Sequence, residues 1–109
     1  MKFLQKIIFK IILTSLIFSV DITFSVDMSN ENLIPDCSPT VAGSFNNWSY
    51  TYELNDIGNG IWQITMDLIP ENYYEYKFGI CNWELENLEP GSNCTATFEQ
   101  WTNRVLNVY

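Results

Sequence analysis

The sequence predicts an all-β fold, an immunoglobulin-like sandwich of about seven antiparallel strands preceded by a signal-peptide helix. Short segments alternate apolar and polar residues with period two, and clusters of Gly, Pro, Asn and Asp separate them. No amphipathic helical stripe follows the first twenty residues. A chain of 109 residues has room for one domain with one core.

The clearest strand is predicted over residues 61–68, where Trp62 shares one apolar face with Ile64, Met66 and Leu68. We therefore expect Trp62 in the core. The preceding residues 55–60 predict a hairpin turn rather than a calcium loop, because Asp56 is their only carboxylate. Further strands are expected over residues 22–28, 40–44, 50–54, 73–80, 94–98 and 104–109.

The first twenty residues have the pattern of a secretory signal peptide. Lys2, Lys6 and Lys10 precede an uncharged apolar run over residues 11–20, which is too short to span a bilayer. A weak cleavage site lies near Ser19-Val20. The sequence thus predicts a signal peptide over 1–20, a domain over 21–109, a secreted or periplasmic location, and no stable membrane insertion after cleavage.

The charge of the exported part restricts its partners. Only Lys77 and Arg104 remain as bases, against 13 acidic residues. Nucleic acid is excluded as a partner because phosphate binding needs clustered bases. A neutral polysaccharide is not affected by this charge. The chain has no histidine and no Cys-x-x-Cys pair, so we expect no metal and no cofactor.

The three cysteines allow one disulfide and leave one thiol over. Cys81 and Cys94 bracket one loop between two predicted strands, which favours their pairing. Pairing of either with Cys37 stays open.

A tryptophan follows the strand that ends at Gly43-Ser44. Asn46 and Asn47 tolerate the positive φ values of a sharp corner, so Trp48 is expected on a loop, as a core plug or as an exposed platform. In the strand over residues 73–80, alternation places Lys77 on the outward face, where a solvated ion pair with Glu75 or with a cross-strand acid is the simplest role.

Taken together, these segments resemble a known family. The order is Gly-Ser-Phe-Asn-Asn-Trp at 43–48, the strand with Trp62, Tyr-Glu-Tyr-Lys-Phe at 74–78, Trp83, and Asn-Arg-Val-Leu-Asn-Val at 103–108. This order resembles the glycogen-binding domain of AMP-activated protein kinase β subunits and the related starch-binding modules attached to amylases and branching enzymes. The resemblance covers roughly residues 21–109.

The resemblance implies an immunoglobulin-like sandwich that binds α-glucan without catalysis, acting alone or beside a separate glycan-active enzyme. Trp48 and Trp83 would be the stacking platforms, and Lys77 and Asn103 the hydrogen-bonding residues. Arg104 departs from the pattern, because the family has two consecutive asparagines there. The acidic stretch with Glu84, Glu86 and Glu89 is a second departure.

Two other functions are weighed against this one. An immunoglobulin-like interaction domain that has lost sugar binding would bury both Trp48 and Trp83. A small glycosidase would need two carboxylates across a cleft, and Glu84 and Glu86 are the candidates, without a second lobe to form that cleft. We therefore expect no enzymatic activity.

Overall fold

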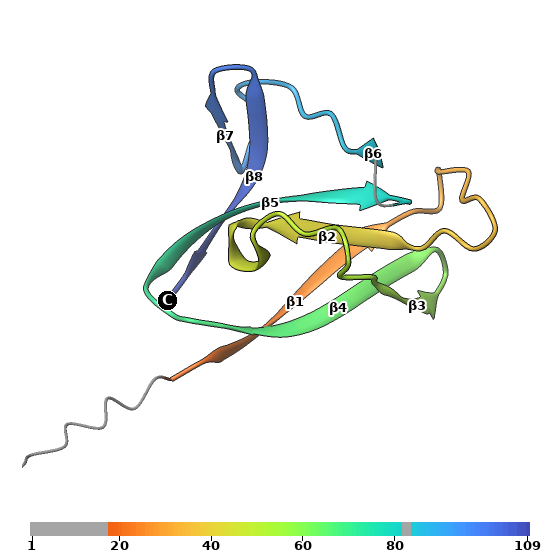
Figure 1. Ribbon diagram of the computed structural model, residues 1–109, viewed down its shortest axis with the longest axis horizontal. Coiled ribbons are helices and arrows are strands. Elements are labelled where there is room, and N and C mark those ends of the chain that lie inside the picture. Colours follow the sequence, from red (N-terminus) through yellow and green to blue (C-terminus); the bar gives the residue numbers. More distant parts are fainter. Residues whose placement is uncertain (1–17, 82–83) are drawn as a thin grey trace, which may run out of the picture.

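The computed structural model describes residues 18–81 and 84–109, and within them the chain is an all-β sandwich of two antiparallel sheets (Figure 1). The predicted all-β sandwich is confirmed. Most of the predicted signal peptide, residues 1–17, lies outside the described residues. The elements in chain order are β1 (Val20–Asp27), β2 (Pro39–Gly43), the 3-10 turn η1 (Ser44–Asn46), β3 (Asn55–Gly58), β4 (Ile61–Leu68), β5 (Asn72–Ile80), β6 (Glu84–Leu85), β7 (Thr95–Phe98) and β8 (Trp101–Val108).

The smaller sheet has the strand order β1-β4-β3. β1 and β4 pair antiparallel over their whole length, from Val20 opposite Leu68 to Asp27 opposite Ile61. The period-two alternation of both strands therefore places one apolar face on the core and one polar face in solvent.

The position of β3 corrects the sequence prediction. Residues 50–54 were expected to form a strand, but they contribute only an isolated bridge between Thr40 and Glu53. β3 itself begins at Asn55, inside the expected turn, and the turn narrows to Asn59 and Gly60, both with positive φ. All four β3 residues are exposed, so no apolar alternation marks this strand in the sequence.

The larger sheet has the order β2-β5-β8-β7, and β6 also pairs with β5. β8 begins at Trp101, earlier than the predicted start at residue 104, and its two halves have different partners. Its first half, up to Arg104, pairs with β7, and its second half, from Arg104 to Val108, pairs with β5. Figure 1 shows the β7–β8 hairpin standing away from the rest of the sandwich.

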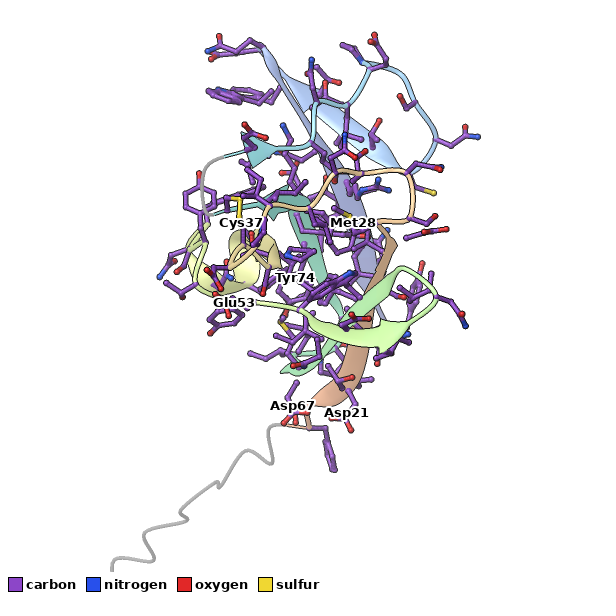
Figure 2. The ribbon with its side chains drawn as sticks, turned by 90° about the vertical axis from the view of Figure 1, so that its right-hand side faces the viewer. Asp21, Met28, Cys37, Glu53, Asp67 and Tyr74 are labelled. Atoms are coloured by element: carbon purple, nitrogen blue, oxygen red, sulfur yellow. A yellow bond between two sulfur atoms is a disulfide. The ribbon has the colours of Figure 1, made fainter. Side chains whose placement is uncertain are left out.

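The core lies between the sheets. Its buried side chains come from five strands and from the segment before β3, namely Phe24, Val41, Leu54, Leu68, Phe78 and Val108. Trp62 packs against this cluster while partly buried, in agreement with its predicted position on the apolar face. Tyr74 lies between the two layers in Figure 2 and also packs on the core.

The disulfide joins Cys37 to Cys81, so the expected pairing of Cys81 with Cys94 is wrong (Figure 2). The reason is the register of β2 and β5, which sets Pro39 opposite Ile80. The cysteines just before β2 and just after β5 thus have Cα atoms 4.9 Å apart. Cys94 lies ahead of β7, is exposed, and is unpaired among the described residues.

In the described part of the chain, no helix has the length and apolarity needed to cross a membrane.

Candidate functional site

The larger sheet forks along one edge of β5. From Asn72 to Tyr76 this edge pairs with β8, and at Gly79 and Ile80 it pairs with β6. Lys77 lies where one partner strand replaces the other. Beyond this point, within the described residues, β8 pairs with β7 and no longer with β5, so the sheet opens into two arms.

The side chains of the fork divide between two faces. Tyr74, Tyr76 and Leu106 point to the core, where they pack on the buried cluster. Strand alternation therefore turns Glu75 and Lys77 to the outer face, and on β8 it does the same for Asn103. The outer face at the fork thus presents a carboxylate, an ammonium and an amide from neighbouring strands.

The corner before Trp48 is built by Asn46. Its amide oxygen accepts a hydrogen bond from the Gly43 backbone N–H at 2.9 Å, and its Nδ2 donates to the carbonyl of Ser49 at 3.2 Å. Asn47 and Trp48 then adopt left-handed conformations, with φ of 54° and 58°. The Trp48 backbone N–H donates to the Gly43 carbonyl at 2.9 Å. A tight, hydrogen-bonded turn therefore fixes the direction of the indole.

Gly43 is required at this corner. A Cβ placed there would lie 2.6 Å from the Glu75 carbonyl oxygen and 2.9 Å from the Cβ of Tyr76. No side chain fits at these distances, so only glycine lets β2 run this close to β5 before the chain turns.

A groove with a volume of about 410 Å³ lies on this outer face. Three of the four predicted binding residues, Trp48, Lys77 and Asn103, line it. Trp83, the fourth, lies outside the described residues. Trp48 is half-buried, as expected for a ring with one face against the protein and one toward the groove. The remaining lining residues, which sequence reasoning missed, are Tyr50, Glu75, Leu85, Phe98 and Trp101.

Lys77 departs from its expected environment. It lies on the outer face, as alternation predicted, but its residue surface is only 8% exposed. The expected solvated ion pair with Glu75 or a cross-strand acid is not found among the described residues, where the salt bridge joins Arg104 to Glu86. Lys77 shares the groove with aromatic and aliphatic side chains, and a lysine stem can lie against apolar surface of this kind.

Arg104 and Glu86, which lie in the two segments that depart from the pattern of the resembled family, bind each other. The Arg104 guanidinium donates to both Glu86 carboxylate oxygens, at 2.6 and 2.8 Å. One of these oxygens also accepts a hydrogen bond from the Phe78 backbone N–H at 3.1 Å. The guanidinium carbon lies 5.6 Å from the centre of the Phe78 ring. Arg104 on β8 and Glu86 beyond β6 thus tie the two arms of the fork together.

The ion pair also shifts the pKa of Arg104. The hydrogen bonds to Glu86 raise the pKa of Arg104, and partial burial of the guanidinium opposes them. The pair is two-pronged and partly shielded from water, so it fixes geometry better than an exposed ion pair does.

The two carboxylates weighed for a glycosidase lie in different environments. Glu86, one of the two carboxylates weighed for a glycosidase, is held by Arg104 and by backbone, while Glu84 is exposed. In the described residues, no group of three or more Cys, Asp or Glu side chains is placed to hold a metal ion. What the groove offers a ligand is aromatic surface with an ammonium, an amide and a carboxylate beside it.

Compared with known proteins, the chain is matched by no family model and by no curated protein.

Proposed function

We propose that this domain is a secreted, non-catalytic carbohydrate-binding module that binds α-glucan chains in the outer groove. The observation that carries the proposal is the convergence of Trp48, Lys77 and Asn103 on one groove, although they come from three separate parts of the chain. These are three of the four binding residues that the sequence resemblance implies.

The chemistry of the groove suits a sugar. A pyranose ring has a face of C–H bonds that packs on an indole, and its hydroxyl groups need directed donors and acceptors at the rim. Trp48 supplies the apolar surface. The Lys77 ammonium donates, the Glu75 carboxylate accepts, and the Asn103 amide can do both.

The net charge of the chain and its disulfide are both consistent with an exported protein that binds a neutral polysaccharide. The chain carries a net charge of −8, which repels anionic polymers and leaves a neutral polysaccharide unaffected. The Cys37–Cys81 disulfide is of the kind that forms and persists in an oxidising compartment, which supports export.

The test is affinity electrophoresis through gels containing glycogen, soluble starch, hydroxyethyl cellulose or glycol chitin. We expect glycogen and starch to retard the parent protein and Trp48→Ala to lose most of the retardation, because stacking dominates a weak site. Tyr52→Ala is the matched control, since Tyr52 is an exposed aromatic residue on the same loop that does not line the groove.

Thermal melts must accompany these gels, and Trp48→Ala should melt close to the parent. A parent that no glucan retards would contradict the proposal and favour the alternative, an immunoglobulin-like interaction domain. Equal retardation of Trp48→Ala and the parent would show that sugar binds elsewhere.

A further inference from the structure

We infer that Phe98 and Trp101 form a second stacking platform, so that the groove binds an extended internal stretch of glycan rather than a single terminal sugar. This inference rests on the proposed function and adds to it the length of chain that the groove recognises. Neither residue belongs to the set that the resemblance implies.

The two aromatic residues are placed together by the β7–β8 hairpin. Phe98 ends β7, Trp101 begins β8, and the two are directly opposite in the strand register. Opposed residues of an antiparallel pair project from the same face of the sheet, so the two rings are neighbours. A turn of only two residues, Glu99 and Gln100, joins them, and Glu99 has a φ of 54°.

The pair faces the groove. Asn103 lies two residues after Trp101 on β8 and therefore projects from the same face. Both aromatic residues line the groove together with Asn103 and Lys77. The other face of the hairpin carries Thr97 and Thr102, whose hydroxyl oxygens are 2.9 Å apart and hydrogen-bonded. The hairpin thus has an aromatic face toward the groove and a hydroxyl-bonded face away from it.

Exposure separates this pair from core aromatics. Phe98 is 75% exposed and Trp101 is 56% exposed, whereas the core aromatics Phe24 and Phe78 are almost fully buried. Two large apolar side chains held together in solvent contribute little to the stability of the domain. Such a patch is typical of a binding surface.

The position of the pair sets the kind of ligand. Trp48 and Tyr50 enter the groove from the corner after β2, and Phe98 and Trp101 enter it from the hairpin, with Lys77 and Asn103 also lining it. Because the two aromatic groups enter from separate elements, we expect a glycan that contacts both of them to span more than one sugar. The volume of about 410 Å³ is within the range of small-ligand clefts.

A protein or lipid partner fits this surface less well. Polar groups from Glu75, Lys77 and Asn103 lie among the rings. A lipid-inserting tip would also be opposed by Glu99 in the turn and by the net negative charge of the chain. A neutral glycan, which has both hydroxyl groups and C–H faces, matches this combination of polar and aromatic side chains.

The experiment is isothermal titration calorimetry of the parent and single alanine variants with maltotriose and maltoheptaose. For the parent we expect tighter binding of maltoheptaose than of maltotriose. Trp101→Ala and Phe98→Ala should each weaken maltoheptaose binding by roughly three- to tenfold and leave maltotriose binding unchanged. Trp48→Ala should weaken the binding of both.

Tyr73→Ala is the matched control, because Tyr73 is an exposed aromatic residue on the same sheet face but outside the groove. It should bind both oligosaccharides as the parent does. Maltoheptaose binding that is unchanged in both Trp101→Ala and Phe98→Ala would overturn the inference. So would an equal loss for the two sugar lengths, which would place the hairpin in the same subsite as Trp48. A parent that binds neither sugar would overturn the proposed function itself, and the inference with it.

Discussion

The two solvent-facing sheet surfaces of this sandwich contrast sharply. On the smaller sheet, polar side chains of β1 and β4 form hydrogen bonds across the strands. The Thr23 and Thr65 hydroxyl oxygens are 2.7 Å apart, and Gln63 Nε2 donates to the Ser25 hydroxyl at 3.2 Å. On the larger sheet, aromatic and charged side chains surround a groove.

The difference shows where the binding chemistry is concentrated. A face whose polar groups bond to each other offers a ligand little to replace. The larger sheet instead leaves aromatic rings accessible and departs from a regular ladder, because its strands fork at Lys77. The regular smaller sheet covers the core, whereas the forked larger sheet covers the core and also forms the groove.

The largest expected effect concerns the disulfide, which belongs to the forked sheet. Replacing Cys37 and Cys81 together by serine should lower the free energy of unfolding by about 4 kcal/mol, because the bond closes a loop with a sequence separation of 44. Urea unfolding monitored by tryptophan fluorescence measures this change. Cys94→Ser is the control and should unfold as the parent does, since Cys94 is exposed. A larger loss in Cys94→Ser than in the double variant would contradict the pairing.

The next effect tests the tie across the fork. Arg104→Leu keeps apolar contact with Phe78 but removes both hydrogen bonds to Glu86, so the free energy of unfolding should fall by about 1–3 kcal/mol. Glucan retardation should weaken too, because Asn103 is the neighbouring residue on β8.

Glu84→Gln is the control for this prediction, since Glu84 is an exposed carboxylate on β6 without an ion pair in the described residues. Chemical denaturation and affinity electrophoresis of the same samples give both readouts. Full stability of Arg104→Leu would show that the fork is held by backbone pairing alone.

A smaller effect is expected at Lys77. Lys77→Met retains the covered stem and removes the ammonium, so glycogen binding should weaken by roughly three- to tenfold while stability does not fall. We expect no loss of stability because Lys77 is almost fully buried, and a buried ammonium loses hydration when the chain folds. Loss of stability without loss of binding would assign Lys77 to the scaffold instead.

The smallest effect lies on the opposite face. Asp21 is directly across from Asp67, and Figure 2 shows the two side by side at the end of the sandwich. Hydrogen bonding to Asp21 and its negative charge raise the pKa of Asp67. The folded state therefore binds this proton more tightly than the unfolded state does. As a result, the free energy of unfolding rises as the pH falls toward the raised pKa of Asp67.

Asp67→Asn should therefore melt slightly higher than the parent at neutral pH, because the substitution removes the charge that Asp67 places next to Asp21. The difference should vanish in acid, where Asp67 of the parent is already protonated. Glu31→Gln, which removes an exposed carboxylate away from this pair, should show no such pH dependence. Thermal melts across the acidic range measure the difference, and a gap that widened in acid would reverse the assignment.

Alternation explains which parts of the fold could be predicted. Residues 61–68 and 73–80 show one apolar face and one polar face, and both form strands that pack on the core. β3 has no such pattern because every residue in it is exposed. The disulfide depends on the register of β2 against β5, strands far apart in the sequence, and local spacing carries no information about that register.

The groove was partly predictable for similar reasons. Trp48 follows a recognisable Gly-Ser-Phe-Asn turn, and Lys77 lies in an alternating strand. Phe98 and Trp101 were missed because their hairpin turn, Glu99-Gln100, lacks the Gly, Pro, Asn or Asp that usually marks a turn. The sequence does show two aromatic residues on either side of two polar residues. This pattern indicates a binding pair only once the hairpin that brings the aromatic residues together is known.

The attachment of the β7–β8 hairpin has an evolutionary consequence. Within residues 18–81 and 84–109, β7 pairs only with β8 and contributes no buried side chain to the core. Substitutions at the hairpin tip can therefore accumulate without a large loss of stability, since they leave the packed interior intact. Selection can change the preferred ligand of this domain at residues 98–101 while the scaffold that supports it stays the same.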